Sequence, residues 1–383
     1  MPVSIPKFQE LFSRLIATPS VSSLDPAWDQ SNRPVADALA SWLEELGFAV
    51  EIIPVSGDPE KVNLLACAGT GGGGLVLSGH TDTVPYNEEA WEQDPFKLRE
   101  ADNRYYGLGV SDMKCFFPIV LDVLRDMDVS KFKQPLLILA TCDEESTMAG
   151  AKALVSAKRS LGRNALIGEP TGLQPVHMHK GIMQETIKLI GKSGHSSDPA
   201  LGINALEGMN TVINSLIQWR AELQSRNQNT LFKVPVPTLN FGCIHGGDNP
   251  NRICGDCSMQ IDIRLLPGMD IEDCRASLRR RVMECLDGAG FTLEFDSIFP
   301  GLPALETDVE SDIVKTAEKL SGRASGTVAF GTEGPYLNSL GMQTVVLGPG
   351  DIEQAHRANE FLSLDRIEPM KRIVREMIKH YCM

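Results

Sequence analysis

The sequence has no apolar run long enough to cross a membrane, and its first residues lack the apolar core of a signal peptide. Positive charge is also scarce, because 36 Lys and Arg residues stand against 50 Asp and Glu and give a net charge of -14. A surface of this sign repels nucleic acid and anionic lipid, so we expect neither as a partner. Internal repeats are absent as well.

The cysteines also give no indication of a disulfide-bonded architecture. Nine cysteines, an odd number, are scattered through the chain rather than grouped in a framework. We therefore expect reduced thiols and a cytoplasmic location. At 383 residues with 42% hydrophobic content, the chain is long enough to form two domains, each with its own core.

The hydrophobic pattern of the outer parts of the chain predicts an α/β fold. Amphipathic patterns predict helices after Pro6 and up to Gly47, and a third helix covers 116–123. Short apolar runs between and beyond them read as buried strands at 75–77, 136–140, 165–167 and 344–347. Buried strands that alternate with helices predict a mostly parallel sheet with helices on both faces.

The pattern changes near residue 183. A strand, a long helix, two strands, a basic helix and a last strand follow, at 183–190, 206–217, 238–241, 259–263, 271–285 and 291–295. This order is the split βαβ arrangement of a small α+β domain of ferredoxin-like type. We therefore expect a first part of the catalytic domain at 1–181, an inserted domain at 182–297 and a second catalytic part at 298–383.

Each predicted core strand is followed by side chains that bind metals or move protons. They are His80 and Asp82 after the first strand, Glu144 and Glu145 after the second, Glu169 after the third and His356 after the fourth. Asp112 stands just before the helix at 116. Open α/β sheets form their sites at the carboxyl ends of their strands, so these groups are expected to meet.

Imidazole and carboxylate without thiolate favour a catalytic zinc, cobalt or manganese site. If 143–145 is extended, Glu144 and Glu145 point opposite ways, so one faces a metal and the other can hold the water. Asp82 is positioned to accept the His80 N–H that is not used for metal binding. Taken singly, each residue has a simpler interpretation as a solvated acid or a histidine with satisfied hydrogen bonds.

The chain resembles a family of di-metal amidohydrolases and peptidases that includes aminoacylase, succinyl-diaminopimelate desuccinylase and acetylornithine deacetylase. The strings are SGHTDTVP at 78–85, GLGVSDMK at 107–114, DEE at 143–145, GEPT at 168–171 and SGHSSDP at 193–199. The resemblance implies a zinc-exopeptidase-like fold and two divalent metal ions, with Zn²⁺ as the first expectation and Co²⁺ or Mn²⁺ as alternatives. It implies one metal at His80, Asp112 and Glu169, another at Asp112, Glu145 and His356, and Glu144 as the base.

In this family the inserted domain acts as a lid and forms a homodimer. The resemblance then implies that His195 reaches the partner subunit's site and stabilises the oxyanion. It also implies that Asn251 and Arg264 bind the substrate carboxylate, a group that suits a guanidinium fork. The simpler interpretation of Arg264 is a surface ion pair.

Within the family, further strings resemble the acetylornithine deacetylases: IATPS at 16–20, NPNRIC at 249–254, DIRLLPG at 262–268, GTE at 331–333 and LGPGDIEQAH at 347–356. The implied substrate is a small N-acyl amino acid, N2-acetyl-L-ornithine. Glu333 would pair with its δ-ammonium, although an exposed loop glutamate is the simpler alternative. A desuccinylase, an aminoacylase, a carboxypeptidase or dipeptidase, and an inactive binding or regulatory dimer are the alternative functions.

Overall fold

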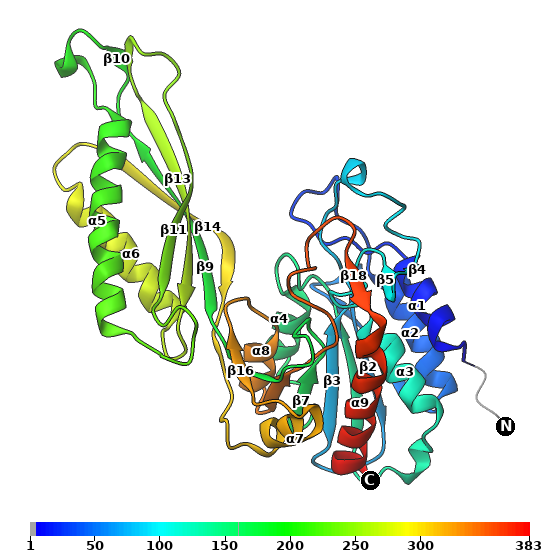
Figure 1. The fold of residues 1–383 in the computed structure, drawn as a ribbon. Coiled ribbons are helices and arrows are strands. Elements are labelled where there is room, and N and C mark those ends of the chain that lie inside the picture. Colours follow the sequence, from blue (N-terminus) through cyan, green and yellow to red (C-terminus); the bar gives the residue numbers. More distant parts are fainter. Residues whose placement is uncertain (1–4, 160) are drawn as a thin grey trace. The chain divides into compact units, whose positions relative to one another are not determined.

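The computed structural model describes residues 5–159 and 161–383, which form two compact units (Figure 1). Unit 1 contains the chain up to His177, Thr307–Gly326 and Thr332–Met383. Unit 2 contains Met178–Glu306 and Thr327–Gly331. None of the helices in the described part of the chain combines the length and apolar character needed to cross a membrane.

Unit 1 is built on a mixed sheet whose centre is parallel. Its strands lie in the order β1-β2-β6-β3-β7-β17-β8. The four central strands are β6 (Leu136–Thr141), β3 (Leu75–His80), β7 (Asn164–Ile167) and β17 (Gln343–Val346), and they pair in parallel. Every residue of β3 and β6 is buried, as expected for a parallel sheet covered on both faces. The predicted α/β class is confirmed.

Antiparallel strands extend this sheet on both sides. β1 (Ala49–Val55) and β2 (Asp58–Ala68) form a hairpin that pairs through β2 with β6, and β8 (Val176–His179) pairs with β17. The sequence pattern did not indicate these strands. Two short strands, β15 (Leu305–Glu306) and β16 (Gly326–Val328), pair with β8.

Helices of unit 1 bury their apolar faces against its sheet and against one another, α1 packing on α3. They are α1 (Phe8–Ile16), α2 (Arg33–Glu45), α3 (Phe116–Arg125), α4 (Ala149–Ser156), α7 (Asp312–Ser321), α8 (Gly334–Ser339) and α9 (Ile367–Cys382). α9 packs on α3 and β3 and buries Met370, Val374, Met377 and Ile378. Each such side chain contributes about 1.5–3 kcal/mol when fully buried. Short 3₁₀ turns occur at Glu88–Ala90, Val129–Lys131 and Leu364–Arg366 in unit 1, and at Pro199–Leu201 in unit 2.

A small three-stranded sheet joins distant parts of unit 1. It consists of β4 (Arg99–Ala101), β5 (Arg104–Tyr106) and β18 (Phe361–Ser363). β18 pairs antiparallel with β5, with Phe361 opposite Tyr106. The residues just before β18 therefore lie beside the loop that follows β5.

Unit 2 has one antiparallel sheet with two helices packed on it. Its strands are β9 (Gly181–Ile190), β11 (Thr238–Gly246), β13 (Asp256–Leu265) and β14 (Thr292–Leu302), in the order β11-β13-β9-β14. α5 (Ala205–Arg226) and α6 (Ile271–Cys285) complete the predicted strand-helix-strand-strand-helix-strand sequence. Burial alternates strictly along β9, because one face meets the helices and the other does not. β10 (Gly194–His195) and β12 (Arg252–Ile253) form a separate two-stranded ladder.

Candidate active site

The side chains expected at the strand ends meet at one edge of the parallel sheet. β3 ends at His80, and the loops after β6, β7 and β17 carry the acidic pair, Glu169 and His356, respectively. Asp112 lies in the loop before α3. These strands run parallel, so their carboxyl ends share an edge and the five loops converge there.

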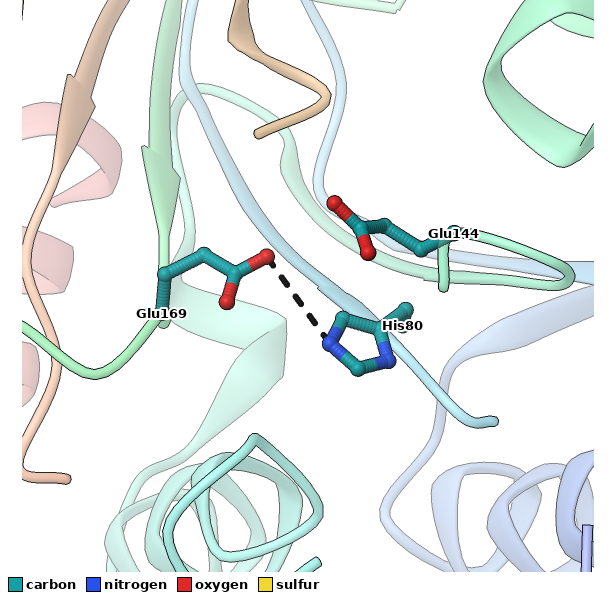
Figure 2. A group of neighbouring side chains, drawn as sticks. All are labelled: His80, Glu144 and Glu169. Atoms are coloured by element: carbon teal, nitrogen blue, oxygen red, sulfur yellow. Dashed lines mark ion pairs between the residues drawn. The ribbon is translucent and has the colours of Figure 1, made fainter. Parts of the chain in front are cut away.

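Asp112 lies between the two histidines. Its Oδ1 is 3.1 Å from Nε2 of His80, and its Oδ2 is 3.6 Å from Nε2 of His356. Glu169 approaches the same nitrogen of His80, with Oε1 3.8 Å from Nε2 (Figure 2). Glu145 pairs with His356, with 3.0 Å between Oε2 and Nε2. The arrangement has two halves that share one carboxylate.

Two overlapping groups of ligand atoms are compact enough to hold a metal ion. The first is His80, Glu144 and Glu169, whose side chains converge in Figure 2, and the second is His80, Asp112 and Glu145. Within each group the ligand atoms lie within 4.8 Å of one another. Because Glu144 belongs to the first group, geometry alone does not separate the base from the ligands.

The electrostatics of this cluster favour bound cations. Burial raises the pKa of Glu144 and of Glu169, and mutual repulsion between carboxylates raises both further. Burial alone would lower the pKa of His80, but Glu169 and Asp112 outweigh it and the net direction is upward. The hydrogen bond to Glu145 raises the pKa of His356 to about 9. Divalent cations compensate such crowded negative charge, so the residues fit metal ions with nitrogen and oxygen ligands.

Asp82 has a different partner from the one expected. Nδ1 of His80 is 3.1 Å from the main-chain oxygen of Asp82, whereas the nearer carboxylate oxygen is 3.7 Å away. The other carboxylate oxygen accepts the backbone N–H of Glu145 at 3.0 Å. Burial raises the pKa of Asp82 to about 6. The residue thus orients His80 through its main chain and the Glu145 loop through its side chain.

The acidic pair lies in a turn, so the premise of an extended segment at 143–145 is wrong. Residues 144–147 form the turn, and Asp143 has a positive φ of 56°. The Asp143 carboxylate accepts hydrogen bonds from Ser22 Oγ and Lys61 Nζ, each at 2.8 Å. No sequence pattern indicates these two contacts, which hold the residue just before Glu144.

Glu333 is buried, with 1% of its surface exposed, and the alternative of an exposed loop glutamate is wrong. Thr141 Oγ1 donates to Oε2 at 2.8 Å, while Oε1 has no hydrogen-bond partner among the described residues. Burial raises the pKa of Glu333 to about 7. Its charge also raises the pKa of Glu144 and Glu169, so it lies close to the cluster.

Three expected substrate-facing residues belong to unit 2. His195 is exposed, and its Nδ1 lies 2.7 Å from Ser197 Oγ. The main chain of Asn251 accepts the N–H of Ser196 at 3.1 Å, so His195 and Asn251 are neighbours.

Arg264 lies at the opposite end of the unit 2 sheet. It pairs with Ile182 at the start of β9, whereas β10, with His195, follows the end of β9. Arg264 lies eight positions along β13 from Asp256, a span of about 25 Å. The guanidinium is half-buried and bonds Asp262 at 2.8 Å. Within a single unit 2, Asn251 and Arg264 are therefore too far apart to bind the same small ligand.

A family model described as peptidase family M20/M25/M40 matches residues 76–380. The chain belongs to this family. An acetylornithine deacetylase from Photorhabdus laumondii is 46% identical over 383 residues, covering 100% of this chain and 99% of the relative. Other relatives with the same name, among them one from Pasteurella multocida at 44%, also match along almost the whole chain.

Solved structures show the same fold. An M20 family metallo-carboxypeptidase from Sulfolobus solfataricus aligns with a TM-score of 0.77 at 19% identity, covering 98% of this chain and 99% of that chain. A dinuclear metal binding peptidase of the M20 family from Bacillus subtilis aligns with a TM-score of 0.66 at 16% identity, covering 98% and 97%.

Proposed function

We propose that this protein hydrolyses the amide of N2-acetyl-L-ornithine to L-ornithine and acetate, with two divalent metal ions as cofactors. The observation that carries the chemistry is the position of Asp112, with one oxygen toward His80 and the other toward His356. The substrate rests on relatives named acetylornithine deacetylase that match over the full length.

In this proposal each half of the cluster holds one ion. His80, Asp112 and Glu169 would bind the first, and Asp112, Glu145 and His356 the second. Bound ions would supply a Lewis acid for the scissile carbonyl and lower the pKa of water. Zn²⁺ is the ion we propose, with Co²⁺ and Mn²⁺ as alternatives, because imidazole and carboxylate suit all three.

Glu144 is the group that moves the proton. Its burial and the nearby carboxylates raise its pKa above the usual value of a glutamate, which makes the carboxylate a stronger base. It would take the proton of the attacking water on its carboxylate and return it to the nitrogen of the leaving amine. Asp82 would hold His80 and the Glu145 loop in position.

Binding of the substrate carboxylate and stabilisation of the oxyanion are assigned to residues of unit 2, which act within a homodimer. We propose that 182–297 is the dimerisation domain and that His195 acts in the partner's site. Arg264 would bind the substrate carboxylate, and because Asn251 neighbours His195, it would enter the site from the same subunit as His195. The cytoplasmic location stays a prediction.

A rate assay on three substrates tests the proposed function. Acetylornithine should be cleaved faster than succinyl-diaminopimelate and acetylmethionine, and a chelator should abolish all three activities, with recovery on adding Zn²⁺ or Co²⁺. Chelator-resistant cleavage would remove the metal mechanism. Faster cleavage of another substrate would favour the desuccinylase or aminoacylase alternative, and no cleavage of these or of dipeptides would favour the inactive dimer.

Glu333→Gln tests recognition of the substrate ammonium. The amide keeps the size and the bond from Thr141 but removes the charge. We expect kcat/KM for acetylornithine to fall roughly tenfold or more, because a hydrogen bond to a charged group contributes about 1.5–3 kcal/mol. Cleavage of neutral acetylmethionine is the control, because it reports any effect of the lost charge on Glu144 and Glu169, and it should fall less than cleavage of acetylornithine. An unaltered ratio between the two substrates would exclude Glu333 as the ammonium partner.

A further inference from the structure

Glu360 has a buried carboxylate that accepts backbone hydrogen bonds from the loop carrying Asp112. Its Oε1 accepts the backbone N–H of Ser111 at 2.6 Å and of Asp112 at 3.0 Å, and its Oε2 accepts that of Gly109 at 2.9 Å. It is 2% exposed. Three amide donors on one carboxylate fix a loop that has no regular structure of its own.

The segment that carries His356 is attached to the same loop at a second point. Ser111 Oγ donates to the main-chain oxygen of Asp351 at 3.2 Å and accepts its N–H at 2.9 Å. A Cβ on Gly350 would lie 2.2 Å from the Ser111 carbonyl oxygen, so the two backbones are in close contact. Asp351 and Glu360 thus attach 351–360 to the Asp112 loop on both sides of His356.

We propose that Glu360, together with the Ser111 hydroxyl, is the positioning residue of the metal-binding half formed by Asp112, Glu145 and His356. This inference rests on the two-metal function proposed above. His356 is itself exposed, and the side chains that it contacts, Glu145 and Asp112, are ligands of the same ion in the proposal. The two attachments supply the missing constraint, because they set the distance between Asp112 Oδ2 and His356 Nε2.

Of the other half of the cluster, the attached loop carries only Asp112, the carboxylate that both halves share. His80 is fixed by the end of β3 and by the main chain of Asp82. Glu169 follows the end of β7, within the buried parallel sheet. Loosening these attachments moves two ligands of the second ion, Asp112 and His356, but only Asp112 of the first, so the second ion should be weakened more.

Titration with metal alone tests the proposal. The full chain is stripped with a chelator and titrated with Zn²⁺ or Co²⁺ by calorimetry, and the Co²⁺ form is followed by visible absorption. In Glu360→Gln an NH₂ group replaces one of the two acceptor oxygens. This group faces backbone N–H donors, either that of Gly109 or those of Ser111 and Asp112, and cannot accept from them. We expect about 10- to 100-fold weaker binding of one ion and a changed absorption spectrum for that ion.

Two further variants complete the test. Glu353→Gln makes the same chemical change at an exposed position of the same segment and should bind both ions as the wild type does. Ser111→Ala removes the other attachment and should weaken the same ion as Glu360→Gln. If Glu360→Gln does not fold, the result for Ser111→Ala decides the test. Wild-type affinity for both ions in the folded variants would overturn the proposal, whereas a wild type that binds fewer than two ions would overturn the two-metal function instead.

Discussion

Glu144→Gln is expected to lower kcat by roughly two orders of magnitude or more while both metal ions stay bound, because it removes proton transfer and no ligand. KM should change little, since the carboxylate acts on the attacking water. The measurement is steady-state kinetics on acetylornithine together with metal analysis of the same protein sample.

The adjacent residue is the matched control. Glu145→Gln makes the same change one position along the chain but removes the partner of His356 at 3.0 Å. It should lose affinity for one ion, and added Zn²⁺ or Co²⁺ should restore part of the activity. If instead Glu144→Gln lost an ion and Glu145→Gln kept both, the two roles would have to be exchanged, because Glu144 also lies within ligand distance of His80 and Glu169.

Strand ends were predictable because periodicity and topology together determine them. The apolar runs ending before His80, Cys142 and Gly168 became β3, β6 and β7, with ends within a few residues of those expected. Parallel pairing then brings their loops to one edge without further information. The side chains on those loops could be named as a cluster from the sequence for this reason.

Contacts between distant segments were not predictable in this way. Glu360 and Gly109 are 251 residues apart, and a single glutamate after a loop carries no pattern that reveals its three amide donors. The hairpin of β1 and β2 was missed because its strands are partly exposed and mixed in polarity. The turn at Glu144 was not predictable either, because Ser22 and Lys61, which bond the adjacent Asp143, are far away in sequence.

A mixture of two inactive variants is expected to recover activity if His195 acts in the partner's site. His195→Ala should lower kcat by roughly 10²–10³-fold, as the loss of an oxyanion donor does. Co-expression of differently tagged Glu144→Gln and His195→Ala chains allows purification of the mixed dimer. One of its two sites then has both Glu144 and His195, so it should show about half the wild-type rate per dimer.

Action of His195 within its own chain gives a different outcome. Each chain of the mixed dimer would then lack one of the two groups, and the rate would stay at the level of the separate variants. The control is a dimer of two Glu144→Gln chains that carry the two tags. Any activity that this dimer recovers does not depend on His195. Asn251 enters the same test, because its main chain bonds Ser196 beside His195 whereas Arg264 lies about 25 Å along the sheet. Asn251→Ala in place of His195→Ala should therefore also be rescued by Glu144→Gln, and Arg264→Ala should be rescued only if Arg264 too acts across the dimer.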